Sequence, residues 1–175
     1  EDFAPAWMPG GEEIVFGGRD PSETNALTTF RIGTGFTDEP VPYGGHAAYS
    51  WDHLSPHPNG EGVALTHYEG SHRISLLRSG ASEIEFIASS PGASNWAPAF
   101  SPDGRWLAFV SDGNGQAQVY VLSYPETNLK RVVSLNGGTE PVWSVDGGAL
   151  YFLDGRKMMA ASFATDTGAS GTPRD

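Results

Sequence analysis

Short apolar runs separated by glycine-rich turns dominate the chain, and one arrangement of them occurs four times. Residues 97–110 (APAFSPDGRWLAFV) place a short apolar strand, an Asp-Gly turn and a second apolar strand in succession. Residues 140–153, 4–16 and 54–65 repeat this order, with Asp-Gly, Gly-Gly and Asn-Gly in their turns. These dipeptides tolerate the positive φ angles of a tight hairpin. The pattern therefore predicts four β-hairpins.

The second turn glycine of each hairpin marks the period of the repeat. These glycines lie 43 to 49 residues apart, at Gly11, Gly60, Gly104 and Gly147. Further candidate strands follow the first three hairpins at 27–32 and 39–43, at 73–77 and 83–87, and at 118–122 and 129–135. Four antiparallel strands in about 40 to 45 residues are typical of a propeller blade. We expect one all-β propeller region over 1–175, built of four-stranded antiparallel blades at about 1–45, 46–93, 94–138 and 139–175.

Two positions of the repeat are expected to lie in the core. One aromatic position recurs in the first strand of three copies, at Trp7, Phe100 and Trp143. A second apolar position recurs in the second strand of all four copies, at Phe16, Leu65, Phe109 and Phe152.

The repeats alone do not decide whether the four blades close into a complete ring. A blade buries its two faces only against neighbouring blades, so an open array leaves one face uncovered at each end. An uncovered apolar area on the order of 400 Å² forgoes roughly 10 kcal/mol of stabilisation. Residues 164–175 are small and polar, which makes them a poor outer strand for the last blade. We expect a partial propeller, or one that assembles with a partner such as a second copy, rather than a closed four-bladed ring.

Composition and charge narrow the possible functions. The 175 residues include 23 Gly and 13 Pro, which argues against a helical bundle, while 38% hydrophobic residues argue against disorder. The absence of Cys excludes disulfides, thiol nucleophiles and cysteine-ligated metals. A net charge of −11 repels nucleic acid, and no apolar run is long enough to span a bilayer. We expect neither a nucleic-acid partner nor membrane insertion by this chain, and the acidic charge favours basic partners.

Residues 100–112 (FSPDGRWLAFVSD) resemble the Pro-Asp type of WD-like β-propeller repeat. That repeat occurs in TolB-like periplasmic proteins, in propellers of prolyl-oligopeptidase relatives and in propellers fused behind bacterial serine/threonine kinases. The resemblance continues through 118–121 and 137–144 to 157–160, and it is most similar there to the kinase-associated group. Val145 departs from the pattern because proline usually precedes the turn aspartate, but the substitution is compatible with a turn.

Patterns that carry catalysis or metal binding are weak in this chain. There is no Gly-x-Ser-x-Gly nucleophile elbow and no phosphate-binding loop. All five histidines fall between His46 and His72, but Pro56 and Pro58 exclude the helix that would make His53 and His57 a metal-binding pair. We expect surface and turn histidines. Residues 144–148 fit the Ser-x-Asp-x-Gly box of sialidase propellers, yet the other copies do not, which favours a plain hairpin. No catalytic residue, metal or cofactor is expected.

The register of the repeats predicts a binding rim. Propellers bind ligands where the loops that enter the innermost strands converge, at one end of the central channel. Aligning the copies on the first-strand proline places Phe3, Asp52, Trp96 and Thr139 at equivalent sites of this end, with Trp51, Asn95 and Glu140 beside them. Aromatic rings mixed with acids and an amide suit a peptide, a cation-bearing group or a sugar. Packing of Phe3 and Trp96 between blades is the alternative.

The resemblance implies a non-catalytic scaffold for protein–protein or small-ligand recognition. Such a scaffold would be a sensor or interaction domain of a larger bacterial protein, located outside the cytoplasm. The competing expectation is an accessory propeller that gates access to the catalytic domain of a prolyl-oligopeptidase-like serine peptidase, encoded beyond these residues. The motif identifies the fold better than the function, because one fold hosts many activities.

Overall fold

The computed structural model describes residues 3–19, 27–35, 39–48, 53–68, 70–88 and 92–175, which form four antiparallel sheets of four strands each. Blade 1 consists of β1 (Phe3–Trp7), β2 (Glu13–Arg19), β3 (Leu27–Gly33) and β4 (Val41–Ala48). Blade 2 consists of β5 (Leu54–Pro56), β6 (Val63–Tyr68), β7 (His72–Leu77) and β8 (Ile84–Ala88). Blade 3 consists of β9 (Asn95–Phe100), β10 (Trp106–Ser111), β11 (Gln118–Ser123) and β12 (Lys130–Val132). Blade 4 consists of β13 (Thr139–Trp143), β14 (Ala149–Asp154), β15 (Lys157–Ala164) and β16 (Ala169–Ser170).

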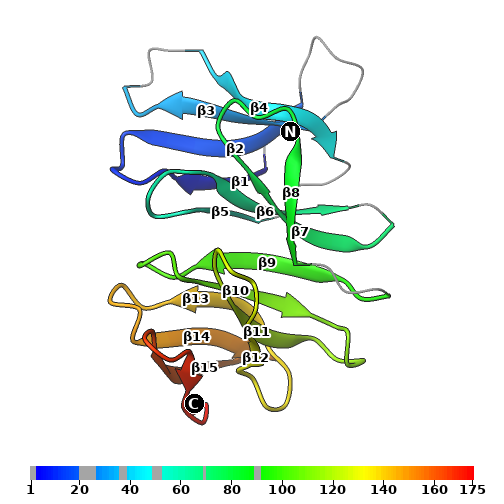
Figure 1. The fold of residues 1–175 in the computed structure, drawn as a ribbon, viewed down its shortest axis with the longest axis vertical. Coiled ribbons are helices and arrows are strands. Elements are labelled where there is room, and N and C mark those ends of the chain that lie inside the picture. Colours follow the sequence, from blue (N-terminus) through cyan, green and yellow to red (C-terminus); the bar gives the residue numbers. More distant parts are fainter. Residues whose placement is uncertain (1–2, 20–26, 36–38, 49–52, 69, 89–91) are drawn as a thin grey trace.

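The four blades form an open array. Strands pair in chain order within each sheet, and the first strands β1, β5, β9 and β13 are neighbours in turn. Blade 1 lies at one end of the long axis of the molecule and blade 4 at the other (Figure 1). The expectation of an all-β partial propeller is therefore confirmed. The described residues contain no helix with the length and apolar character needed to cross a membrane.

The hairpin turns between first and second strands are stabilised locally. Gly104 and Gly147 have φ angles of 71° and 72°, which glycine adopts without strain. In blade 3, the Ser101 hydroxyl and the Arg105 N–H both donate to the Asp103 carboxylate, at 2.6 and 3.1 Å. Ser144 and the Gly148 N–H bind Asp146 in the same way. Because the two turns share one bonding pattern, the box-like sequence at 144–148 forms a structural hairpin.

Three hydrophobic clusters occupy the three spaces between consecutive blades. The cluster between blades 1 and 2 includes Val15 and Leu65, and the one between blades 2 and 3 includes Phe109. The cluster between blades 3 and 4 includes Trp143 and Phe152. We call the side of a blade that faces its predecessor the back face, and the opposite side the front face. Residues at the shared core positions lie on back faces.

Trp7 contradicts its predicted place in the core. Phe100 and Trp143, at the same position of the repeat, are 8% and 9% exposed, whereas Trp7 is 61% exposed. Phe16 is only partly buried, while Leu65, Phe109 and Phe152 are buried as predicted. The reason is that Trp7 and Phe16 lie on the back face of blade 1, on which no sheet of the described chain packs.

The C-terminal segment differs from its expectation in a smaller way. Residues 169–170 pair with β15 and form a two-residue fourth strand. Arg174 adds an isolated bridge to Ala160. The polar composition of the segment shortens this strand without abolishing it.

Candidate binding site at the strand-start end

The first strands of blades 2 to 4 begin at one end of the sheets, which we call the strand-start end, and their hairpin turns lie at the opposite turn end. Asn95 and Trp96 begin β9, whereas Thr139 and Glu140 begin β13. Phe3 begins β1. The other two predicted rim residues, Trp51 and Asp52, lie outside the described residues. The described members of the predicted rim in blades 3 and 4 therefore share one end of the array.

Trp96 lines a hollow of about 340 Å³ at this end, together with His53, His72, Ser94 and Asp112. Its indole is partly buried and also packs against the cluster between blades 3 and 4. Asp112 holds the segment before β9 in place, because its carboxylate accepts a hydrogen bond from the Ser94 N–H at 2.7 Å. The hollow therefore combines an aromatic ring, a carboxylate and two imidazoles, of which only the indole belongs to the predicted rim.

Glu140 reaches across the array to blade 2. Its carboxylate lies 3.5 Å from Nε2 of His53, which precedes β5. The backbone at Glu140 has a φ of 53°, and Ala97 at the equivalent position has a φ of 52°; both residues precede proline. The pairing register of β9 and β13 shifts at these residues. Such bulges re-aim side chains next to binding sites, and the positive φ is a strained conformation that surrounding packing must maintain.

Asn95 is fully buried, and neither atom of its carboxamide has a hydrogen-bond partner in the described structure. Thr139 is partly buried. Nδ1 of His53 is likewise buried without a partner among the described residues. Unpaired buried polar atoms are uncommon in native proteins. The site thus contains hydrogen-bonding capacity that the described residues do not use.

The sequence did not single out His53, His72 or Asp112 for this site. Asp112 directly follows β10, the second strand of the blade 3 hairpin, which runs back to the strand-start end. The length of this hairpin in the sequence could therefore have placed Asp112 beside the start of β9. The expectation of surface and turn histidines is wrong for His67, which is 1% exposed within β6. His57 begins the blade 2 hairpin turn as expected, but its side chain is buried at 6% exposure. In the part of the chain that the structure describes, no group of three or more His, Asp or Glu side chains could hold a metal ion.

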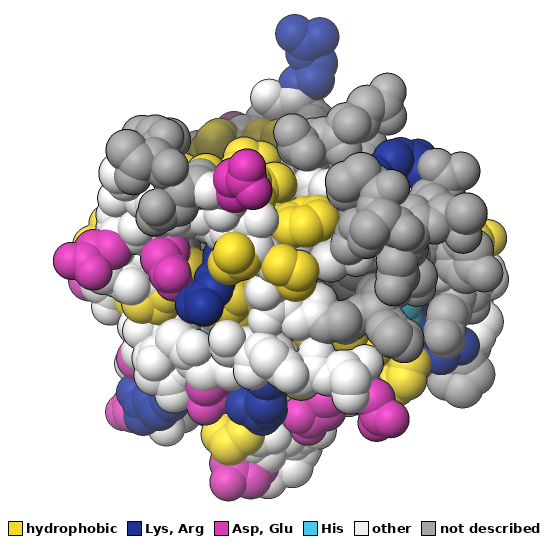
Figure 2. Space-filling view, turned by 90° about the horizontal axis from the view of Figure 1, so that it is seen from above, with side chains coloured by type: hydrophobic (Ala, Val, Ile, Leu, Met, Phe, Trp, Pro, Cys, Tyr) yellow, Lys and Arg dark blue, Asp and Glu magenta, His cyan; other side chains and the backbone are white. Residues whose placement is uncertain are grey.

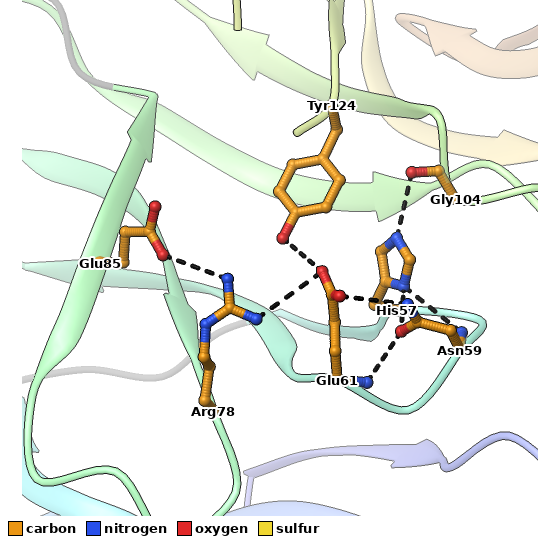
Figure 3. Close-up of polar contacts among 7 residues, drawn as sticks. All are labelled: His57, Asn59, Glu61, Arg78, Glu85, Gly104 and Tyr124. Atoms are coloured by element: carbon orange, nitrogen blue, oxygen red, sulfur yellow. Dashed lines mark hydrogen bonds and ion pairs between the residues drawn. The ribbon is translucent and has the colours of Figure 1, made fainter. Parts of the chain in front are cut away.

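A separate polar cluster joins blades 2 and 3 at the turn end (Figure 3). The Tyr124 hydroxyl donates to the Glu61 carboxylate at 2.6 Å, and the Asn59 amide donates to it at 3.1 Å. Arg78 lies 3.8 Å from the same carboxylate. His57 contacts the Gly104 carbonyl at 3.1 Å through Nε2. The members of the cluster bond to one another, and we interpret the cluster as a connection between blades rather than a binding site.

This cluster predicts a pH-dependent contribution to stability. The hydrogen bonds from Tyr124 and Asn59 hold the pKa of Glu61 below its usual value. A carboxyl whose folded pKa is lowered stabilises the fold above its unfolded pKa of about 4.3, and the contribution is lost as pH falls through the folded value. Tyr124→Phe should therefore lower the free energy of unfolding by about 1 kcal/mol at neutral pH. In urea unfolding, the difference in the free energy of unfolding between the unmodified chain and Tyr124→Phe should become smaller as pH falls below about 4.

Tyr68→Phe is the matched control, because Tyr68 is an exposed tyrosine at the strand-start end. It should leave the pH dependence of stability unchanged. A Tyr124→Phe deficit of constant size from neutral to acidic pH would show that the ionised Glu61 carboxylate does not strengthen this contact.

The sequence and fold of the chain are similar to those of known β-propeller proteins. Residues 50–174 match the family model described as PD40, TolB beta propeller domain. A stretch of 52 residues is 42% identical to the uncharacterized peptidase YuxL of Bacillus subtilis, covering 29% of this chain and 8% of that protein. A stretch of 85 residues is 28% identical to the Tol-Pal system protein TolB 1 of Novosphingobium aromaticivorans, covering 46% and 18% respectively. The chain thus spans a minor part of the length of these curated relatives.

The crystal structure of TolB from Acinetobacter baumannii has the same fold over the whole of this chain. The TM-score is 0.75 at 17% identity, with 100% of this chain and 44% of that chain covered. At this identity the similarity concerns the fold alone.

Proposed function

Because the chain belongs to the TolB beta propeller domain family, we propose that it is a non-catalytic recognition scaffold that binds a basic peptide segment of a protein partner at the strand-start end. The observation that carries the proposal is the hollow lined by Trp96 and Asp112, with the Glu140 carboxylate nearby. An aromatic face and carboxylates attract a cationic side chain. The formal charge of −11 adds a long-range attraction for such a partner.

The wider setting of this scaffold is also part of the proposal. Its TolB relatives support a place outside the cytoplasm. The resemblance of residues 137–144 to kinase-associated propellers supports a sensor or interaction domain within a larger bacterial protein. The chain is further proposed to associate with a second copy of itself.

Binding of a lysine-rich hexapeptide tests the proposed site. In ¹⁵N-labelled protein, the indole N–H resonance of Trp96 should shift on titration with this peptide, because a bound ammonium group changes the field at the ring. A glutamate-rich hexapeptide should produce no shift. Trp96→Ala should weaken binding of the lysine-rich peptide by about tenfold or more.

Trp7→Ala is the matched control, since Trp7 is an exposed tryptophan outside the hollow. This variant should bind the lysine-rich peptide as the unmodified chain does. The proposal fails if both peptides shift the Trp96 resonance equally, or if the lysine-rich peptide leaves it in place.

A second candidate function is supported by the relative named a peptidase. In that case the chain would be the accessory propeller of a prolyl-oligopeptidase-like serine peptidase and would gate access to a separate catalytic domain. The genomic sequence on either side of the coding region distinguishes the two. A downstream Gly-x-Ser-x-Gly domain supports the peptidase, whereas a kinase domain with a membrane span supports the sensor.

A further inference from the structure

Asparagine is followed by glycine at three places in the chain, at 59–60, 114–115 and 136–137. Such a pair is chemically labile, because the glycine nitrogen attacks the asparagine carboxamide without obstruction by a side chain of its own. The attack closes a cyclic imide and releases ammonia. It requires that the carboxamide and the glycine N–H are both free to approach each other. Because the three pairs have the same composition, any difference between their reactivities arises from the fold.

Hydrogen bonds hold both reacting groups of the Asn59–Gly60 pair in the blade 2 hairpin. The Asn59 carboxamide accepts the Glu61 N–H at 2.9 Å and donates to the Glu61 carboxylate at 3.1 Å (Figure 3). The Gly60 N–H donates to the His57 carbonyl at 2.8 Å. Ring closure at this pair therefore requires that these bonds break.

The Asn114–Gly115 pair, between β10 and β11, is restrained in the same manner. The Asn114 amide donates to the Tyr120 hydroxyl at 2.8 Å. The Gly115 N–H donates to the Asp112 carbonyl at 2.7 Å. At this pair too, the carboxamide and the attacking nitrogen are both bonded elsewhere.

The Asn136–Gly137 pair lies in the irregular segment between β12 and β13, and its reacting groups are unrestrained. Among the described residues, neither the Asn136 carboxamide nor the Gly137 N–H has a hydrogen-bond partner. Gln116 donates only to the Asn136 backbone carbonyl, at 2.7 Å. Gly137 is buried, but the side chain over it is the exposed Gln116, because a Cβ atom on Gly137 would lie 2.7 Å from Nε2 of Gln116. Solvent therefore reaches the Gly137 N–H when one flexible side chain moves, without the unfolding of a strand.

We propose that Asn136 is a site of spontaneous deamidation and that it reacts before Asn59 and Asn114. The Gly137 nitrogen gives up its proton to the solvent and forms a bond with Cγ of Asn136. The bond between Cγ and Nδ2 breaks, and the amide nitrogen leaves as ammonia with a proton taken back from the solvent. A water molecule then adds to either carbonyl of the imide, which opens to an aspartyl or an isoaspartyl residue at position 136.

The products change the strand-start end, because position 136 lies shortly before Thr139, at which β13 begins. Both products add a carboxylate to a surface that already carries Asp and Glu side chains at several places (Figure 2). The isoaspartyl product also lengthens the backbone by a methylene group. A Cβ atom on Gly138 would lie 2.9 Å from Ser134 and from Val119, so the segment is too closely packed to absorb the added length. The isoaspartyl product therefore displaces the start of β13.

Peptide mass spectrometry of the chain during incubation at mildly alkaline pH tests the proposal, and it does not depend on the proposed peptide site. In the folded chain, Asn136 should deamidate at least about tenfold faster than Asn59 or Asn114, because each of these must first break two or more hydrogen bonds. In the chain unfolded by guanidinium chloride, the three rates should be similar, because each asparagine precedes a glycine. Folded-state rates that are equal at the three positions, or slowest at Asn136, would overturn the proposal.

Two variants test the physical cause of the difference. Asn136→Gln should remove the early product, because a glutamine side chain closes the corresponding ring far more slowly. Tyr120→Phe keeps the ring but removes the hydroxyl that holds the Asn114 carboxamide, so it should raise the rate at Asn114 several-fold and leave the rate at Asn136 unchanged. Circular dichroism checks that both variants fold. A Tyr120→Phe variant in which Asn114 reacts no faster would contradict the assignment of these rates to hydrogen bonding.

Discussion

Replacing Trp143 with alanine is expected to lower the free energy of unfolding by about 3–5 kcal/mol. The indole is 9% exposed and packs edge-to-face on Phe163, with ring centroids 4.8 Å apart. The substitution leaves a cavity between blades 3 and 4 and removes the donor to the Ala99 carbonyl. Equilibrium unfolding in urea, with the midpoint and slope fitted together, measures the loss.

The control for this substitution is Trp7→Ala, which removes the same side chain from the same position of the repeat. Trp7 is exposed in the single chain, so its loss should lower the free energy of unfolding by less than about 1 kcal/mol. The comparison is made at a protein concentration at which the copies are separate. Equal losses for the two tryptophans would refute the assignment of buried and uncovered back faces.

Gly104→Ala is expected to destabilise the fold by about 2–4 kcal/mol. The backbone at Gly104 has a φ of 71°, which alanine adopts only with strain. A Cβ atom there would also lie 2.5 Å from Nε2 of His57, whose ring contacts Phe100 and Tyr124. The imidazole would have to move, and its contact with the Gly104 carbonyl would be lost. The change in thermal unfolding midpoint, combined with urea unfolding, measures the effect.

Gly60→Ala separates the two causes of that loss. Gly60 occupies the same hairpin position in blade 2 with a φ of 79°, and a Cβ atom there would have no neighbour within 4 Å. This variant should therefore show the backbone strain alone, about 1–2 kcal/mol. If Gly104→Ala and Gly60→Ala destabilised the chain equally, His57 would yield freely and would not connect blades 2 and 3.

Local turn chemistry made the hairpins predictable. Gly11, Gly60, Gly104 and Gly147 all have positive φ angles between 71° and 79°, as their place in the repeat indicated. The strand predicted at 129–135 is shorter, at Lys130–Val132. The Val119 carbonyl still accepts the Val133 N–H at 2.8 Å, but the Val119 N–H donates to the Ser134 hydroxyl, also at 2.8 Å, and not to a backbone carbonyl. A side chain that competes with the sheet in this way carries no periodic signal.

Burial was predictable only where a neighbouring blade is present. Trp7 and Trp143 occupy equivalent positions, so the repeat alone cannot distinguish them; the difference arises from packing between blades. The same holds for His67, which lies in β6 within a blade that has neighbours on both faces. The alternation of polar and apolar residues is weak in such a strand, because both of its faces are buried.

The candidate site was predictable in its place along the repeat but not in its composition. Trp96 was found because it aligns with other copies. His53 and Asp112 line the same hollow as Trp96. Asp112 arrives there because β10 runs back to the strand-start end, and His53 because blade 2 packs beside blade 3. Both depend on tertiary structure. Of the predicted rim, Asn95 lies fully buried, and the roles of Thr139 and Glu140 in binding remain predictions.

Because the blades are stacked one after another, the order in which they unfold can also be predicted. Apart from the ion pair between His53 and Glu140, the contacts described between sheets join only consecutive blades. Nearest-neighbour arrays of this kind fray from their ends, because a terminal unit gives up one interface on unfolding and an internal unit gives up two. Of the four described blades, blades 2 and 3 are thus expected to be the most cooperative.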